Sequence, residues 1–222
     1  MLNTDLFSEL SRKIFHDLIN PASAALNGME LLKYNLTESG EQILEDDTFR
    51  LLEMSIKKIT AQIAFFRFCY SHPEVEKNEN LSVEHIDSIV NDYINFTKLE
   101  ISHGKDLENL NKKFAILFTN TVLILQGMLP QGAEIYYELI DANIFIIQIK
   151  NPTGKINAEI MKDLHADDMN DIKNIQISYL YELLRIYGIN REIISEGDSE
   201  ISINFSNQNQ ADSSSSVGSR KT

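Results

Sequence analysis

Two long stretches of regularly spaced apolar residues open the chain, and they constrain its fold more than any other feature. In the first stretch, roughly Thr4 to Tyr34, apolar side chains recur every three or four residues: Phe7, Leu10, Ile14, Leu18, Ala25, Met29 and Leu32. At about 100° per residue, these positions fall on one stripe of an α-helix. The spacing therefore predicts one long amphipathic helix.

The second stretch follows alternating steps of three and four residues, which is the a and d pattern of a coiled coil. Its members are Phe49, Leu52, Ile56, Ile59, Ile63, Phe66 and Tyr70. The residues between the two stretches, Asn35 to Asp47, include Gly40 and five acids and are typical of a turn. The sequence therefore predicts a helical hairpin.

Two helices alone bury little apolar surface, so the hairpin is expected to pack against further helices. A second copy of the chain is the simplest source, and this predicts a homodimer that forms a four-helix bundle. Alternatively, the hairpin packs on the rest of its own chain. The periodicity leaves both possibilities open.

The chain changes character after the hairpin. A polar stretch that contains Pro73, Ser71 to Asn80, is expected to close the second helix. Two later segments are rich in β-branched and aromatic residues and predict β-hairpins, at 132–151 and 189–205. Further elements are expected around them: a helix capped by Ser82, a strand at Lys98–Ser102, a helix from about Asp106 to Met128, and a helix through Ile177–Ile186.

Together these elements predict an α+β fold. Residues 1–72 form the helical hairpin and residues 81–205 form an α/β sandwich. Residues 206–222 are rich in Ser, Asn and Gln without periodicity, so we expect a disordered tail.

The acidic balance of the chain limits its partners. Twenty Lys and Arg face 33 Asp and Glu, a formal charge of −13, which argues against nucleic acid and anionic membranes as main partners. The single cysteine, Cys69, cannot form an internal disulfide. The N-terminus has no apolar core of a secretory signal, and no apolar run approaches a bilayer span. We therefore expect a cytoplasmic protein.

His16 is the most informative residue, because it lies on the polar side of the first helix. It is about 180° from the centre of the apolar stripe, so it is expected to face solvent rather than the core. The carboxylate of Asp17 is expected to accept a hydrogen bond from one ring nitrogen and leave the other as a nucleophile. Asn20 lies one turn further along the same side, where its amide would orient a phosphoryl group.

Other polar residues on this side of the helix are candidates for partner binding. They are Arg12, Lys13, Ser23 and Asn27. Pro21 removes one backbone hydrogen bond and is expected to bend the helix beside His16.

The segment His16–Pro21, HDLINP, matches the phosphoacceptor box H-[ED]-x-x-[NT]-P of bacterial sensor kinases. The longer string FHDLINPASAALNGMELL resembles more closely the phosphoacceptor helix of ChpT-type histidine phosphotransferases of alphaproteobacteria, roughly C-H-D-L-x-x-P-x-x-A-x-x-N-G-x-E-L-L. Phe15 replaces the usual Cys of that family. The matching positions beyond the box include Ala24, Asn27, Gly28, Glu30, Leu31 and Leu32.

The resemblance implies that His16 is phosphorylated, with Asp17 and Asn20 as its catalytic helpers. It also implies that the second domain is a degenerate histidine-kinase ATPase domain. The implied partners are the receiver domain of a CckA-like hybrid kinase as donor, and CtrA-like and CpdR-like response regulators as acceptors. The Mg²⁺ is expected from the acidic cluster of the receiver, so the chain needs no cofactor or metal site of its own.

Two other functions remain open. An ATP-dependent sensor kinase with a diverged nucleotide site is one, although none of the nine glycines forms a G-x-G pair that would let backbone approach phosphates. Asn120 is either the magnesium-binding Asn of such a kinase or a polar residue on a helix packed against a sheet. A non-catalytic dimerisation module is the other. The remaining histidines lack metal-ligand spacing, so surface or capping roles are expected for them, and Cys69 is expected to be a buried hydrophobe.

Overall fold

The computed structural model describes residues 4–38, 47–71, 79–150, 156–166, 172–196 and 200–207. The helices are α1 (Thr4–Glu38), α2 (Asp47–Cys69), α3 (Val83–Ile94), α4 (Lys112–Met128), α5 (Ala158–His165) and α6 (Ile175–Tyr187). The strands are β1 (Asn80–Ser82), β2 (Leu99–His103), β3 (Asn109–Asn111), β4 (Ala133–Asp141), β5 (Ile144–Lys150), β6 (Ile189–Glu196) and β7 (Glu200–Asn207). We call the part from β1 to β7 the second domain.

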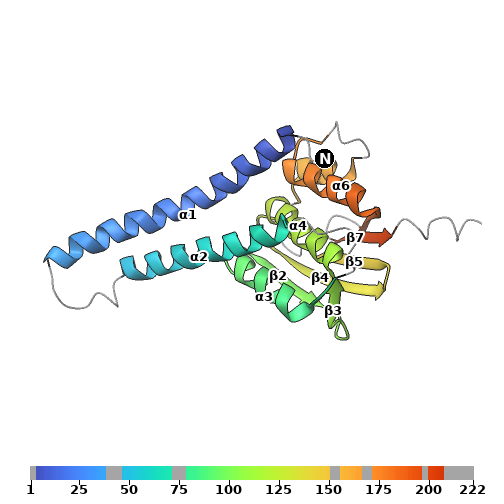
Figure 1. Ribbon diagram of the computed structural model, residues 1–222, viewed down its shortest axis with the longest axis horizontal. Coiled ribbons are helices and arrows are strands. Elements are labelled where there is room, and N and C mark those ends of the chain that lie inside the picture. The colour runs from blue at the N-terminus through green and yellow to red at the C-terminus, as the bar shows by residue number, and fades with distance from the viewer. Residues whose placement is uncertain are drawn as a thin grey trace, which may run out of the picture.

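The predicted helical hairpin is confirmed, because α1 and α2 lie side by side and extend away from the second domain (Figure 1). The two helices approach closely at Gly28, where a Cβ atom would lie 3.4 Å from the Cβ of Leu52. The predicted stripe faces inward at Leu10 and Leu32, which are buried. Pro21 is also buried, and α1 continues through it as one helix.

The predicted turn between the helices begins too early. Helix α1 continues to Glu38, and α2 already includes Asp47. The reason is that residues 35–38 contain neither Gly nor Pro, so nothing in them ends a helix before Gly40. Residues 39–46 lie outside the described part of the chain.

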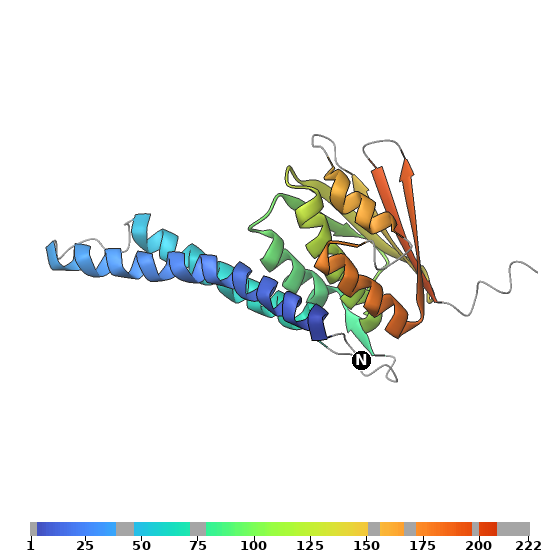
Figure 2. The same cartoon turned by 90° about the horizontal axis from the view of Figure 1, so that it is seen from above.

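Both predicted β-hairpins are confirmed, as β4–β5 and β6–β7. The five-stranded sheet has the order β2-β4-β5-β7-β6, and β2 runs parallel to β4 while the other neighbours are antiparallel. Alternate residues such as Ile135, Tyr137, Ile147 and Ile203 are buried on one face. The helices cover this face (Figure 2), so the sheet and helices form two layers.

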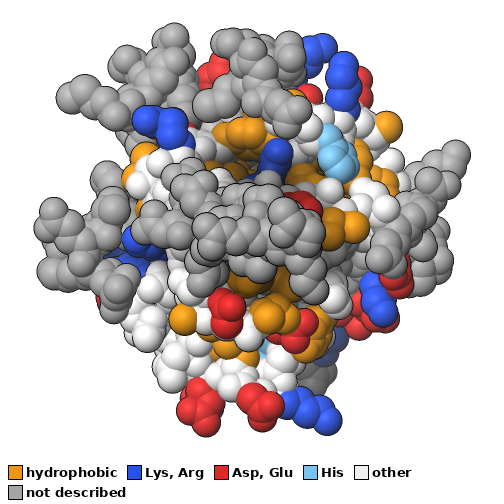
Figure 3. Space-filling view, turned by 90° about the vertical axis from the view of Figure 1, so that its right-hand side faces the viewer, with side chains coloured by type: hydrophobic (Ala, Val, Ile, Leu, Met, Phe, Trp, Pro, Cys, Tyr) orange, Lys and Arg blue, Asp and Glu red, His pale blue; other side chains and the backbone are white. Residues whose placement is uncertain are grey.

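No helix of the described residues packs on the opposite face of the sheet, which is turned toward the viewer in Figure 3. Here Tyr136, Gln148, Ser202 and Ile194 form one row across four strands. Apolar side chains on this face are therefore interspersed with polar ones.

Several boundaries differ from the prediction. Helix α4 begins at Lys112 rather than near Asp106, because residues 109–111 pair with β1 and the side chain of Asn111 caps the helix. Helix α5 and the small β1–β3 sheet were not predicted. Strand β7 includes Ser206 and Asn207, which the prediction assigned to the tail, because Ser206 pairs with Ile144 and the Asn207 N–H donates to the Asn143 carbonyl at 3.2 Å.

One hydrophobic core spans the base of the hairpin and the second domain. Leu10 of α1 and Phe65, Phe66 and Cys69 of α2 belong to the same buried cluster as the sheet and its helices. The ring of Phe65 stacks on that of Tyr93 in α3 with centroids 4.0 Å apart. The base of the hairpin therefore packs on its own chain, which was one of the two alternatives.

Candidate functional site

His16 lies on the outer surface of α1, as the helical wheel predicts. Its side chain is 74% exposed, and its Nδ1 atom lies 3.2 Å from Oδ1 of Asp17. A proton on Nδ1 donates to this carboxylate, which leaves the lone pair of Nε2 directed away from Asp17. The site is therefore an exposed imidazole with one ring nitrogen held against a carboxylate.

The polar residues predicted to share this surface are mostly found there. Asn20, Ser23 and Asn27 are exposed along the same helix. Arg12 is also exposed, and its guanidinium lies 4.0 Å from the carboxylate of Glu9. The structure thus brings these side chains together along one side of α1.

Lys13 differs from its prediction. Its side chain is only half-exposed, and burial lowers the pKa of its ammonium group, while the charge of Asp17 acts in the opposite direction. Lys13 is therefore less exposed than its place on the helical wheel suggested, and its part in partner binding stays a prediction. A helical wheel cannot show that the end of α2 around Cys69, which packs on the second domain, lies near this side of α1.

A second apolar stripe lies beside His16, and the sequence analysis did not identify it. Phe15, Ile19 and Leu26 are 64%, 59% and 55% exposed. They recur at steps of four and seven, which is itself helical spacing, so a search for two stripes would have found them. On α2, Ile56 and Ile63 are each 51% exposed, although the a and d pattern had placed them in the core.

Asn120 is completely buried and acts as a link between helices. Its Nδ2 atom donates to the carbonyl groups of Cys69 at 3.0 Å and of Ile116 at 2.8 Å. Its Oδ1 atom accepts a hydrogen bond from Nε2 of Gln176 at 2.7 Å. This environment agrees with the interpretation of a packed polar residue and does not fit a ligand for a nucleotide-bound Mg²⁺.

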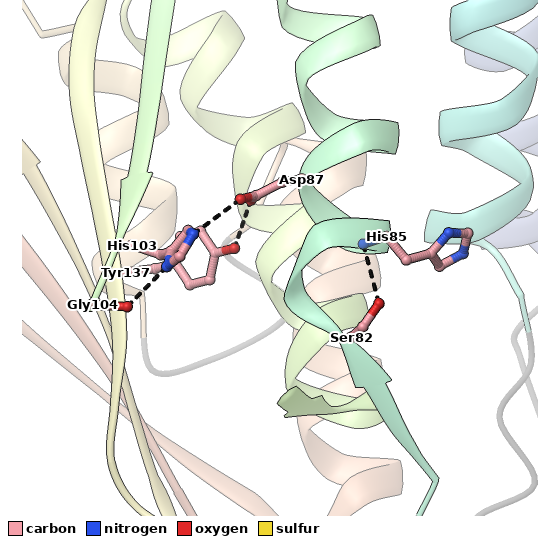
Figure 4. Close-up of polar contacts among 6 residues, drawn as sticks. All are labelled: Ser82, His85, Asp87, His103, Gly104 and Tyr137. Atoms are coloured by element: carbon pink, nitrogen blue, oxygen red, sulfur yellow. Dashed lines mark hydrogen bonds and ion pairs between the residues drawn. The ribbon is translucent and has the colours of Figure 1, made fainter. Parts of the chain in front are cut away.

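His103 and His85 take part in hydrogen bonds within the second domain (Figure 4). His103 lies between two oxygens, with Nδ1 2.8 Å from the Gly104 carbonyl and Nε2 3.2 Å from Oδ2 of Asp87. The hydroxyl of Tyr137 donates to the other oxygen of Asp87 at 2.7 Å. The backbone N–H of His85 donates to the side chain of Ser82, which confirms the predicted cap.

The remaining candidates that the structure describes form no cluster of metal ligands. His165 is exposed in the last turn of α5, and His72 lies outside the described residues. Cys69 is fully buried, as predicted, and burial raises the pKa of its thiol. Within the described residues, no three His, Cys, Asp or Glu side chains gather as metal ligands would.

No helix in the described ranges has the length and apolar character to cross a membrane.

Comparisons with known proteins agree with this description. A family model for the histidine phosphotransferase C-terminal domain matches residues 83–199, more than half of the chain. The protein phosphotransferase ChpT of Brucella abortus (strain 2308) is 24% identical over 165 residues, which cover 73% of this chain and 75% of that protein.

One solved structure shows a similar fold, and a second is a more remote match. A bacterial phosphotransferase structure has a TM-score of 0.71 at 20% identity, over 92% of this chain and 98% of that chain. The histidine kinase AdeS of Acinetobacter baumannii has a TM-score of 0.44 at 13% identity, over 87% of this chain and 98% of that chain. The match of the family model to most of the second domain decides the classification: the chain belongs to the histidine phosphotransferases of two-component signalling.

Proposed function

We propose that this protein relays phosphoryl groups between receiver domains through His16. The observation that carries this proposal is the exposed imidazole of His16, held at Nδ1 by Asp17 and open at Nε2. A nucleophile fixed in one tautomer on a rigid helix needs only a correctly placed phosphodonor.

The proposed reaction begins when the aspartyl phosphate of a receiver docks beside α1. The lone pair of Nε2 attacks phosphorus in line, so that a P–N bond forms while the P–O bond to the receiver carboxylate breaks. The positive charge that develops on the ring is balanced by Asp17 through the Nδ1 proton. The carboxylate of a second receiver then attacks the phosphohistidine and releases the imidazole.

The surroundings of His16 supply the remaining parts of this proposal. The amide of Asn20, one turn along α1, is placed to donate to a phosphoryl oxygen. Arg12, Ser23 and Asn27 are the proposed docking residues, together with Lys13, which is only partly exposed. Mg²⁺ is proposed to come with the receiver, which carries its own acidic cluster.

The proposed partners follow from the resemblance of the phosphoacceptor helix. They are a CckA-like hybrid kinase as donor, and CtrA-like and CpdR-like response regulators as acceptors. The cytoplasm is the proposed compartment, where the thiol of Cys69 stays reduced.

A homodimer is also proposed, because both helices of the hairpin expose apolar side chains. The residues are Phe15, Ile19, Leu26, Met29, Ile56 and Ile63. Two hairpins that pair through these residues form a four-helix bundle. Ile56→Glu with Ile63→Glu should convert the dimer to a folded monomer in light scattering, and Ile140→Glu on the open sheet face should not. A wild-type protein that is already monomeric would contradict the dimer.

An ATP-dependent kinase is the less favoured alternative, since the amide of Asn120 is committed to protein partners. Binding of a labelled ATP analogue would support that alternative. A non-catalytic module is the other, and it predicts no phosphate on the chain.

The deciding experiment mixes the protein with a phosphorylated receiver of a hybrid kinase and follows acid-labile phosphate. Wild-type protein should become labelled, His16→Ala should not, and His165→Ala serves as a control because that histidine is also exposed. If His16→Ala is labelled as strongly as wild type, or if no receiver labels the wild type, the proposal is wrong.

A further inference from the structure

We propose that a buried chain of amide hydrogen bonds fixes the second domain against the phosphoacceptor hairpin, and that Gln176 and Asn120 are positioning residues for receiver-dependent transfer. This inference rests on the proposed function of His16. The chain of bonds, which we call the junction network, consists of Cys69, Tyr70, Asn120 and Gln176.

The junction network forms a closed circuit through three helices. Starting at the last residue of α2, the Cys69 carbonyl accepts a hydrogen bond from Nδ2 of Asn120 in α4 at 3.0 Å. Oδ1 of Asn120 accepts from Nε2 of Gln176 in α6 at 2.7 Å. Oε1 of Gln176 then accepts from the hydroxyl of Tyr70 at 2.8 Å. Because Tyr70 follows Cys69 directly, the circuit returns to the end of α2.

The burial of this network makes its geometry specific. Asn120 and Cys69 are 0% exposed and Gln176 is 1% exposed. A buried amide that loses its partner cannot turn to water, so a shift of α6 relative to α2 leaves donors and acceptors unpaired. Apolar side chains would tolerate such a shift far better, because dispersion contacts have little directional preference.

Surrounding contacts hold the network in place. The ring of Tyr70 lies 5.3 Å from that of Tyr179 in α6. Burial raises the pKa of the Tyr70 hydroxyl, so it remains protonated and able to donate to Gln176. The hydroxyl of Tyr93 in α3 donates to Gln126 in α4, which ties the neighbouring helices as well.

The network matters for His16 because α6 contacts α1 as well as α4. Figure 1 shows α6 beside the N-terminal part of α1, on the same half of the helix as His16. A receiver that docks at His16 therefore also contacts the second domain, and Gln176 fixes where that domain lies relative to α1. If that position varied, only part of the population would offer a surface into which the receiver fits.

The test compares two kinds of phosphodonor on the same variants. Phosphoramidate is a small donor that needs only an accessible histidine, so its label is counted on the peptide that contains His16, whereas a phosphorylated receiver needs the whole surface. Gln176→Met keeps the volume of the side chain and removes both of its hydrogen bonds. The matched control is Thr121→Val, since Thr121 is equally buried in α4 but its hydroxyl donates only within that helix, to Leu117.

We expect Gln176→Met to slow transfer from the receiver by about tenfold, because the Asn120 oxygen and the Tyr70 hydroxyl lose their partner, with labelling by phosphoramidate unchanged. Thr121→Val should retain wild-type rates with both donors. Equal loss with both donors, or an unchanged receiver rate in Gln176→Met, would overturn the inference.

A distance measurement tests the network independently of the proposed function. Spin labels at Glu30→Cys in α1 and Glu192→Cys in β6 report the position of the second domain, and Cys69 is too buried to react with them. When labelled chains are diluted with an excess of unlabelled chains, so that only distances within one chain are read, wild type and Thr121→Val should give one narrow distance distribution, and Gln176→Met a broad one. A narrow distribution in Gln176→Met contradicts the network, whereas failure of both donors on wild type contradicts only the relay.

Discussion

At the scale of single residues, neighbouring side chains decide what each titratable group can do. Asp17 is within hydrogen-bond distance of His16, and its charge also acts on Lys13 one turn away. The local sequence was sufficient to predict the first relationship, because the two residues are adjacent. The burial of Lys13 was not predictable, because it depends on elements more than fifty residues away in the chain.

Replacing Asp17 tests its role in orienting His16. Asp17→Asn keeps the shape of the side chain and removes the negative charge that balances the imidazolium. We expect the rate of transfer from a phosphorylated receiver to fall about 10²-fold. Rapid-quench assays of acid-labile phosphate would measure this rate, with Glu30→Gln on the same helix as control. A wild-type rate in Asp17→Asn would exclude the orienting role.

Asp87 provides a second test at this scale, on stability rather than transfer. It accepts hydrogen bonds from Tyr137 and lies against His103, so it joins α3 to β2 and β4. Asp87→Asn should lower the free energy of unfolding by about 1–3 kcal/mol, because the amide cannot accept on both sides. Urea unfolding measures the change. Asp92→Asn, exposed on the same helix, should alter stability by less than about 0.5 kcal/mol. If the two variants lowered the free energy of unfolding equally, Asp87 would not join α3 to β2 and β4.

At the scale of elements, prediction succeeded where the pattern is local and regular. The hairpin helices and both β-hairpins were recognisable because each buries one face of a long, periodic segment. Helix α5 and the β1–β3 sheet were not, since they are short and depend on partners distant in sequence. The role of Asn120 could not be predicted for the same reason. Only the packing of α2, α4 and α6 shows that it is a packed polar residue rather than a magnesium ligand.

Gly28 tests how closely the hairpin helices must approach. A Cβ at this position would lie 3.4 Å from the Cβ of Leu52, which an alanine can occupy in van der Waals contact. Gly28→Ala should therefore keep or raise the melting temperature, since alanine favours helix by about 1 kcal/mol. Gly28→Leu should lower it, because the larger side chain forces the helices apart. Calorimetry measures the melting temperature of both variants. A Gly28→Leu protein as stable as the wild type would contradict the close approach of the two helices.

At the scale of the whole molecule, the shared core links alkaline titration to unfolding. Burial is the main cause that raises the pKa of five tyrosines, namely Tyr70, Tyr93, Tyr137, Tyr179 and Tyr187. For Tyr179 the pKa rises to about 12, compared with about 10 in an unfolded chain. The neutral forms favour the folded state, so their contribution is complete below about pH 10 and is lost as the pH rises towards 12.

The expected result is that these tyrosines ionise together with unfolding rather than one by one. Ultraviolet absorbance of tyrosinate and far-ultraviolet circular dichroism, followed on the same samples, should change at the same pH. If most of the tyrosinate signal developed near pH 10 while the circular dichroism was unchanged, the buried positions of these rings would be wrong.

The continuous core also limits how such proteins can be recombined. Phe65, Phe66 and Cys69 complete the interior of the second domain although they belong to the hairpin. A hairpin taken from a relative would bring different apolar side chains into this interior. A chimaera therefore also needs the residues of α3, α4 and α6 that pack against them. We therefore expect substitutions on the surface of α1 to disturb this core less than an exchange of whole modules does.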